Sequence, residues 1–526
     1  MKHPIYWFCG LIVLSLLAAC GGKTPSAAES TDSSNPYAKN MEISVSLWNV
    51  QDGFDDPNAA NDTIYEELAQ KFNVTLKPVQ VTWNDWMEKF RLWAASNQLP
   101  DAFATDASLG EYKTWATQGV IRALPDDLSK YPNIQAVMSL PSVKPLAING
   151  KFYKFPRMTY KTDADWINDR NILYRKDWAK EAGWDRQPES FEEFVQMCKA
   201  VLANHPEAVG IGQHHNGYLL IIHLGIFPQG SHGGVWAKDA DGLWKPCYAC
   251  DGFAEGVAQL RTLYTEGILD PDFALLKDSD ASAKFMSGQA FAVFAGHVYW
   301  DYEDAFKRAN PGKSAEEVIG LIDMWPNPHD GKRYYFSEAP YWSESMFRGD
   351  MNDEKMDRVL AMLEYMYTDE YKIKVAMGIE GVDYKKENGA YISLLPPDQL
   401  LSKKYPITNK IGSLSAWGQW LGLEGVQIQS SNPNIAYTDK YWQEHYRYTK
   451  EIAIPTPVNY DIRLMSTPAK DKLASVTQDW MLDMVRVIMG KGDPIQEWKA
   501  VIKSYSPGLD DAIREVNEQA KVLGIN

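Results

Sequence analysis

The chain has 526 residues, 45% of them hydrophobic and 23% charged, so it is too long for a single core and too apolar to be disordered. Its formal charge of −16 argues against nucleic acid and anionic lipid surfaces as partners, and favours a neutral ligand over an anionic one. With 19 Trp and 28 Tyr, it carries more amphipathic rings than core packing usually needs, and such rings are common on ligand-binding surfaces.

The N-terminus has the pattern of an exported lipoprotein. Lys2 and His3 precede an apolar stretch that ends in Leu-Ala-Ala-Cys at residues 17–20. We expect cleavage before Cys20 and acylation of that cysteine, so that the lipid alone holds the protein at the extracytoplasmic face of the cell membrane. Residues 1–19 are then the signal peptide and residues 20–40 a flexible tether. An ordinary cleaved signal or a short anchor is the alternative, although the apolar stretch is too short to span a bilayer.

From residue 41 to residue 128 the pattern is strand-helix-strand-helix-strand, which is typical of a parallel sheet with helices on its faces. Ligands bind beyond the carboxyl ends of such strands, and two of these ends, at residues 48–52 and 105–106, would share one rim. Trp48 could equally be a core residue, and the two aspartates could be helix N-caps. The ligand-binding candidates on this rim are Trp48, Asn49, Asp52 and Asp106.

Residues 150–183 contain two apolar strand patterns joined by a polar segment without periodicity. Such a segment suits a chain that leaves one compact unit and enters another, and binding clefts usually lie at such boundaries. We expect Trp166 and Asn168, both in this segment, to contribute a ring face and a hydrogen-bonding group to a site between two lobes.

The same stretch, with GKFYKFP, LYRKDWAKEAGW and PESFEEF in order, resembles the first crossing between lobes in extracellular solute-binding proteins of ABC importers. The similarity is to the carbohydrate-binding branch that includes maltose-binding protein, and within it to the large lipoproteins. The resemblance implies an α/β, two-lobed periplasmic-binding-protein-like fold of class II, each lobe a mostly parallel sheet flanked by helices, with a hinge between. It also implies ligand contacts from the loops after the first strand and after the Pro-Asp-Ala-Phe strand.

A strand pattern at residues 208–212 leads into a loop with two adjacent histidines. Side by side on a loop, histidines seldom ligate one metal ion together, and no HExxH or carboxylate spacing accompanies them, so polar ligand contacts are favoured over a metal. The candidates in this loop, at the equivalent rim of the second lobe, are His214, Asn216 and Tyr218. Residues 236–244 form a hairpin pattern, and its Trp236 could face either ligand or core.

The stretch FMSGQAFAVF at residues 285–294 is a second point of similarity to the family. The family segment runs into a short turn with an aromatic residue that stacks on sugar, and His297, Tyr299 and Trp300 hold that place here. The proline-tryptophan pair usual in the family is absent, so which ring stacks stays open. A third crossing near residues 337–347 would bring Trp342 and Glu344 to the same site.

These crossings define the expected domain boundaries. We expect residues 41–160 plus 297–340 to form the N-terminal lobe and residues 170–292 plus 345–526 to form the C-terminal lobe. The hinge crossings are then residues 161–169, 293–296 and 341–344.

No cofactor, metal site or catalytic constellation is expected. Cys247 and Cys250 have the spacing of a redox motif or half a zinc site, but no second pair accompanies them, so a local disulfide or two separate thiols is favoured. Large members of the family often hold calcium after the helix that here ends at Asn204, yet residues 204–207 offer too few carboxylates. The chain also lacks GxSxG, Walker, GxGxxG and HExxH motifs.

The sequence therefore favours a receptor over an enzyme. Trp and Tyr rings suit the C–H faces of a pyranose, while Asp, Asn and His suit its hydroxyl edge. We expect a monomer that binds a neutral oligosaccharide between its lobes, closes about the hinge, and presents the ligand to ABC permease subunits. The main alternative is a surface lipoprotein that cleaves glycans with two carboxylates. An adhesion or scaffold lipoprotein would explain the anchor but not the two lobes.

Overall fold

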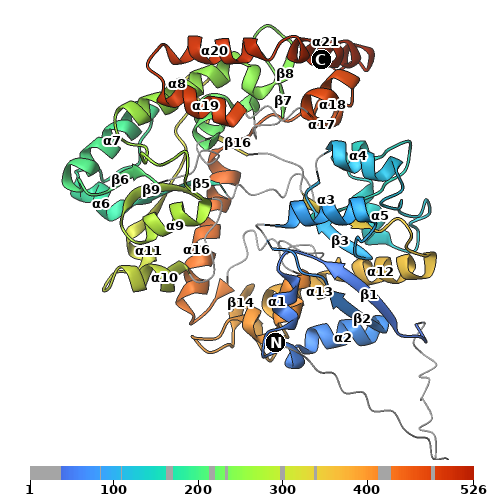
Figure 1. Cartoon of the computed structure of the whole chain (residues 1–526). Helices are drawn as coiled ribbons and strands as arrows, with labels where there is room; N and C mark the ends of the chain where they lie inside the picture. The colour runs from blue at the N-terminus through green and yellow to red at the C-terminus, as the bar shows by residue number, and fades with distance from the viewer. Residues whose placement is uncertain are drawn as a thin grey trace, which may run out of the picture.

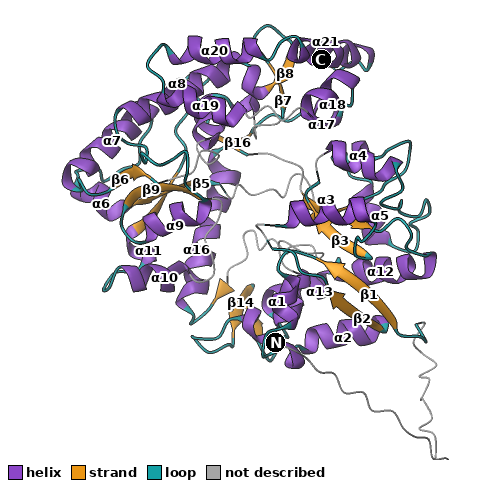
Figure 2. Cartoon of the chain, in the orientation of Figure 1, coloured by secondary structure: helices purple, strands orange, loops and turns teal. Residues whose placement is uncertain are grey.

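The computed structural model describes residues 37–82, 85–107, 109–160, 170–212, 219–230, 235–295, 302–336, 341–412, 428–475 and 480–525. Two bodies stand side by side, each with its own sheet and its own surrounding helices (Figures 1 and 2). The first lobe begins with the segments drawn in blue in Figure 1, and the second begins with the segments drawn in green.

The first lobe is built on one mixed sheet. Its strands are β1 (Met41–Ser46), β2 (Val74–Pro78), β3 (Ala102–Thr105), β4 (Phe155–Met158) and β12 (Tyr341–Phe347), in the spatial order β2-β1-β3-β12-β4. A smaller sheet joins β13 (Tyr384–Glu387), β14 (Ala390–Ser393) and β15 (Ile428–Gln429). The helices of this lobe are α1 (Val50–Phe54), α2 (Thr63–Phe72), α3 (Trp86–Ser96), α4 (Leu109–Thr117), α5 (Pro132–Met138), α12 (Asp353–Met366), α13 (Asp369–Met377), α14 (Leu401–Lys404) and α15 (Pro406–Gly412), with short 3-10 turns η1 (Ala59–Asn61) and η2 (Lys144–Leu146).

The second lobe has a mixed sheet of β10 (Ile319–Ile322), β5 (Asn171–Arg175), β9 (Ala290–Ala295) and β6 (Val209–Ile211), in that spatial order. Two ribbons, β7 (Trp236–Lys238) with β8 (Trp244–Pro246) and β11 (Tyr334–Tyr335) with β16 (Ile454–Pro455), lie outside it. The helices are α6 (Lys176–Glu181), α7 (Phe191–Asn204), α8 (Asp251–Thr265), α9 (Asp278–Met286), α10 (Tyr302–Ala309), α11 (Ala315–Val318), α16 (Pro433–Arg447), α17 (Tyr460–Leu464), α18 (Pro468–Ser475), α19 (Trp480–Met489), α20 (Pro494–Ser504) and α21 (Gly508–Val522), with π-helical turns at Ile221–Ile226 and Tyr448–Ile452 and 3-10 turns at Pro228–Gly230 and Cys247–Ala249.

In each sheet one strand runs against all the others. β12 is antiparallel to β3 and β4, while β1, β2 and β3 are mutually parallel, and β5 is antiparallel to β9 and β10, while β6 is parallel to β9. β5 and β12 are the strands by which the chain enters a lobe from the other one. An entering strand begins at the edge where the other strands end, and it must therefore run in the opposite direction. The expectation of a mostly parallel sheet thus holds for strand direction, but the reversed strand is internal and makes both sheets mixed.

Local sequence rules account for the helices as predicted. The Asp62 carboxylate accepts a hydrogen bond from Tyr65 N at 3.0 Å and so caps α2. The Ser190 hydroxyl accepts from Glu193 N at 3.1 Å and caps α7 in the same way. The apolar residues of α2 recur at i, i+4 and i+8, and all three are buried: Ile64, Leu68 and Phe72.

Strand pairing corrects the expected domain boundaries. Residues 302–336 belong to the second lobe, because β10 pairs with β5, and residues 345–412 belong to the first, because β12 pairs with β3 and β4 and α12 packs on the same core. Residues 293–295 lie in β9 inside the second sheet, so no crossing occurs there, and residues 341–344 lie in β12 after the crossing. The chain changes lobe between β4 and β5, between β11 and β12, and between β15 and α16. Residues 161–169 lie outside the described residues.

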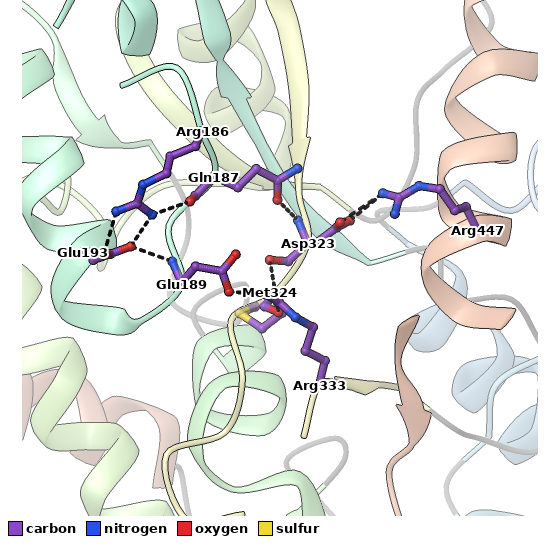
Figure 3. A network of polar contacts seen from close by, with 8 residues as sticks. All are labelled: Arg186, Gln187, Glu189, Glu193, Asp323, Met324, Arg333 and Arg447. Atoms are coloured by element: carbon purple, nitrogen blue, oxygen red, sulfur yellow. Dashed lines mark hydrogen bonds and ion pairs between the residues drawn. The ribbon is translucent and has the colours of Figure 1, made fainter. Parts of the chain in front are cut away.

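A polar network ties α16 to the second lobe after the last crossing (Figure 3). The Arg447 guanidinium donates to both carboxylate oxygens of Asp323, at 3.1 and 3.0 Å, just beyond the end of β10. The Gln187 side-chain oxygen accepts from Asp323 N at 2.7 Å, and Arg333 donates to the Asp323 carbonyl at 3.2 Å and contacts Glu189. The residue that follows β10 is thus bonded to α16 through Arg447 and to two other segments through Gln187 and Arg333.

The two lobes have separate hydrophobic cores. The larger second-lobe core includes Trp498, which stacks on Phe253 at 5.5 Å and donates its indole N–H to the Tyr248 carbonyl at 2.9 Å. Near the C-terminus α18 packs on α21 and also reaches α4 of the first lobe, where Lys113 lies 3.7 Å from Asp471. The C-terminal helices therefore contact both lobes.

Candidate functional site

The edge of the first sheet where β1, β3 and β4 end is the edge from which the chain leaves for the second lobe. Because β12 enters there, its first residues stand beside the ends of the parallel strands, with Glu344 opposite Thr105. A group of charged and aromatic side chains gathers on this edge. We call it the edge cluster, and it consists of Trp48, Lys154, Arg157, Trp342, Ser343 and Glu344.

Two tryptophans form the aromatic part of the edge cluster. The Trp48 and Trp342 rings stack with centroids 5.2 Å apart and planes inclined by 27°, and Trp86 meets Trp48 edge-on at 5.4 Å. Trp48 is 3% exposed, whereas Trp342 is only half-buried. Trp48 is therefore a packed residue that supports Trp342, which was one of its two expected roles. Asn49 follows in a left-handed conformation with φ 55°, which turns the chain into α1.

The two aspartates predicted on this rim are both exposed. Asp52 lies in α1 and stays within the first lobe, accepting from Gln80 at 3.1 Å and lying 3.8 Å from Lys410. Asp106 follows β3 directly and lies near enough to Glu344 for its charge to act on that carboxyl. Asp106 thus lies beside the edge cluster, whereas the contacts of Asp52 are with other residues of the first lobe.

The ionic part of the edge cluster is buried. Lys154 donates to Glu344 Oε1 at 2.9 Å, and both side chains are nearly inaccessible. Arg157 donates through Nε to the Ser343 hydroxyl at 3.2 Å, and its guanidinium lies 5.2 Å from the centre of the Trp342 ring. The pairing of β12 with β4 shifts in register between Tyr341 and Glu344, so β12 is irregular over these residues.

Burial is the largest influence on the pKa values of Arg157 and Glu344. It lowers the pKa of Arg157 to about 10, and it raises the pKa of Glu344, with Lys154 opposing that rise and Asp106 adding to it. Sequence inspection did not find Lys154 or Arg157 as site residues. The available clue was their place inside the apolar run Phe-Tyr-Lys-Phe-Pro-Arg-Met, because a charge within a buried strand needs a partner.

The matching edge of the second lobe is where β5 begins after the crossing. β6, β9 and β10 all end at this edge, since Ala295 is opposite Asn171 and Ile322 is opposite Ile172. The predicted contacts in the loops after β6 and β9 are thus attached to strands that end toward the first lobe. These residues, His214, Asn216, Tyr218, His297, Tyr299 and Trp300, and also Trp166 and Asn168 of the first crossing, lie outside the described residues.

Trp236 has a packing role in place of the ligand contact that was one of its expected roles. Its ring is 7% exposed and packs with α17 and α21, and Lys470 Nζ lies 5.3 Å from its centre. The predicted hairpin itself is confirmed by the pairing of β7 with β8. On a surface hairpin, strand alternation would leave the Trp236 ring exposed. Here the C-terminal helices cover this ring.

Cys247 and Cys250 are two separate thiols, which was one of the two alternatives favoured for this pair. Cys198, Cys247 and Cys250 are buried thiols that form no disulfide, and burial raises the pKa of the Cys247 thiol to about 12. Within the ranges that the structure describes, no group of three His, Cys, Asp or Glu side chains could hold a metal ion. At the end of α7, His205 stacks on Trp178 at 4.0 Å. In the same ranges, no helix is both long and apolar enough to cross a membrane.

Residues 63–381 match the bacterial extracellular solute-binding protein family. The chain belongs to this family. Lipoprotein LipO of Bacillus subtilis (strain 168) is 24% identical over 341 residues, which span 61% of this chain and 64% of LipO. Membership of a solute-binding family gives no support to the glycan-cleaving alternative.

Solved structures share the two-lobed fold over almost the whole chain. An EF-hand mutant of the ABC-transporter substrate-binding protein FusA from S. pneumoniae, in complex with fructo-nystose, has a TM-score of 0.64 at 17% identity, covering 92% of this chain and 99% of FusA. An extracellular solute-binding protein from Bifidobacterium longum subsp. infantis has a TM-score of 0.62 at 17% identity, covering 91% and 97%. At these identities the likeness establishes the fold, which is the class expected from the sequence.

Proposed function

We propose that this protein is the lipid-anchored substrate-binding protein of an ABC importer and binds a neutral oligosaccharide between its two lobes. The observation that carries this proposal is the pairing of stacked indoles with hydrogen-bonding side chains on the sheet edge where the chain changes lobe. Rings of this kind cover the C–H faces of a sugar, and charged or amide groups bind its hydroxyls. The similar FusA structure holds fructo-nystose, which supports the same ligand class.

Ligand capture works by closure of the lobes. Trp342, Asp106 and Glu344 supply the first-lobe contacts, and the residues after β6 and β9 supply those of the second lobe. The three connections between the lobes absorb the change in backbone dihedral angles as the lobes close. Closure is stabilised by the ligand because only the closed form contacts it from both sides, and this form is the one that permease subunits recognise.

The lipid on Cys20 places the protein at the extracytoplasmic face of the cell membrane, and residues 20–40 give it reach to a membrane-embedded permease. A monomer suffices, since each chain carries both lobes. Expression of the parent and Cys20→Ala in a bacterial host with labelled palmitate tests the anchor. The parent should be labelled and pellet with membranes, and the variant should do neither.

Ligand binding is tested by titrating the purified protein with fructo-, manno- and chito-oligosaccharides while recording intrinsic fluorescence, calorimetric heat and product formation. We expect saturable binding with no product, because the ligand is carried unchanged. Release of shorter saccharides would end the receptor proposal in favour of the glycan-cleaving alternative. Absence of binding to every saccharide would end the oligosaccharide proposal.

A further inference from the structure

Two buried groups of opposite charge on the first-sheet edge have hydrogen-bonding atoms without a partner. Arg157 is 0% exposed, and neither Nη1 nor Nη2 has a hydrogen-bond acceptor. Glu344 is 6% exposed, and its Oε2 atom has no donor, although Oε1 accepts from Lys154. Buried polar atoms in folded proteins are almost always hydrogen-bonded, so a coincidence of three orphaned atoms on neighbouring strands requires a cause.

The two groups do not satisfy one another. Glu344 is paired with Pro156, the residue before Arg157, and its charge acts on Arg157, yet no hydrogen bond or ion pair joins the two side chains. Ser343 holds the Arg157 Nε side at 3.2 Å, and Lys154 holds the Glu344 Oε1 side at 2.9 Å. A third group that contacts both side chains would satisfy the unused Nη donors and the unused Oε2 acceptor.

The chemistry of that third group follows from the donors, the acceptor and the charges. It must accept from Arg157 and donate to Glu344, and a hydroxyl does both. The charges around these atoms have both signs, since Lys154, Arg157 and Arg463 are positive while Glu344 and the adjacent Asp106 are negative. A ligand carboxylate has no hydrogen to donate to Glu344 Oε2 and would face the negative charge of Glu344, whereas a neutral polyol can donate a hydroxyl hydrogen to this atom.

Resting on the proposed function, we propose that Arg157 and Glu344 form a hydroxyl-binding subsite that selects neutral saccharides over those bearing a carboxylate at the same ring. Neighbouring hydroxyls of one sugar ring accept from the Arg157 Nη groups and donate to Glu344 Oε2. Arg157 is covered in this structure, so a neighbour moves when the sugar enters. Trp342 is that neighbour, because its half-buried ring lies against the guanidinium.

Arg157→Met tests the subsite, with Arg358→Met as its matched control. Arg358 is also a buried arginine of the first lobe, but it donates to the carbonyls of Phe72, Lys39 and Asn73 at 2.8, 3.2 and 3.2 Å. Arg157→Met should weaken calorimetric binding of the saccharide that the parent binds by about tenfold to hundredfold, with Tm unchanged or raised, because it removes a buried charge whose two Nη groups have no acceptor. Arg358→Met should lower Tm and leave the affinity unchanged.

The bound saccharide supplies a second arm. Among its monodeoxy forms, at least one should bind the parent about tenfold more weakly and bind Arg157→Met with no further loss. Parent-like affinity of Arg157→Met overturns the subsite alone, and so does a complex in which only water lies between Arg157 and Glu344. A parent that binds no saccharide overturns the proposed function and the subsite together.

Discussion

Trp342 stacks on Trp48, with ring centroids 5.2 Å apart, although the two residues come from first-lobe segments that the whole of residues 170–336 separates in the sequence. Trp48 lies just beyond the end of β1, and Trp342 is near the start of β12, the strand by which the chain returns from the second lobe. The stack therefore forms only when the returning strand has taken its place between β3 and β4. This dependence links folding of the first lobe to the completeness of the proposed binding edge.

Truncation of the two stacked rings should separate stability from binding. Trp48→Ala empties a buried position and should lower the free energy of unfolding by about 3–5 kcal/mol, measured by denaturant titration of the first-lobe transition. Trp342→Ala should cost less stability, since the ring is half-buried, but should weaken oligosaccharide binding about tenfold. Trp498→Ala in the second-lobe core is the control, with lost stability and unchanged affinity. Parent affinity in Trp342→Ala would remove this ring from the site.

The Arg447–Asp323 pair should matter more for the anchoring of α16 than for overall stability. Both side chains are partly exposed, so Arg447→Gln should change the free energy of unfolding by only about 0.2–1 kcal/mol. Amide exchange along α16 should nevertheless accelerate, because the pair ties this helix to the end of β10. Arg486→Gln breaks an exposed pair within α19 and should leave α16 unaffected. Identical exchange along α16 in the parent and Arg447→Gln would contradict the anchoring role.

Lys470 should make stability rise with pH above neutrality. Burial lowers the pKa of Lys470 from 10.5 to about 7, even though its ammonium donates to the carbonyls of Ile462 and Arg463 at 2.6 and 3.0 Å. Between pH 7 and 10.5 the unfolded chain binds more protons at this site than the folded one, so this contribution grows as the pH rises. Below pH 7 both states are protonated, and the buried charge is a constant cost.

Lys470→Met removes the amine that binds this additional proton when the chain unfolds. The free energy of unfolding of the parent minus that of the variant should therefore increase from pH 7 to pH 10, measured by denaturant titration at each pH. Lys503→Met, at an exposed position of α20, should show a constant difference over the same range. A constant difference for Lys470→Met would mean that its ammonium stays charged in the folded protein.

The segment after α7 should not hold a stabilising calcium ion. Within the described ranges no cluster of carboxylates could hold a metal ion, and the segment after α7 is used by His205 for stacking on Trp178. Dialysis against EDTA, and then addition of calcium at millimolar concentration, should leave Tm unchanged. An increase of several degrees with calcium would reveal a bound ion, because a ligand that binds only the folded state raises Tm.

Much of the fold was predictable because it depends on short-range patterns. Asp62 and Ser190 cap helices where the local sequence predicts, and the β7–β8 hairpin turns at Gly242 with φ 82°. The assignment of residues 302–412 to lobes was wrong, because it depends on pairings such as β12 with β3, which no local pattern encodes. Lys154 and Arg157 were missed as site residues for the same reason, since Lys154 meets Glu344 across 190 positions of sequence.

The sequence alone determined the export pattern at the N-terminus and the α/β class, because these follow from composition, periodicity and capping. The two-lobed family came from the resemblance of its local motifs. Only the tertiary structure decided that Trp48 supports Trp342, that Trp236 is a packing residue, and that Arg157 and Glu344 are buried with unused hydrogen-bonding atoms. Burial and pairing depend on which distant segments cover a side chain. A residue type at a given position therefore leaves its role open until the returning strand and the C-terminal helices are in place.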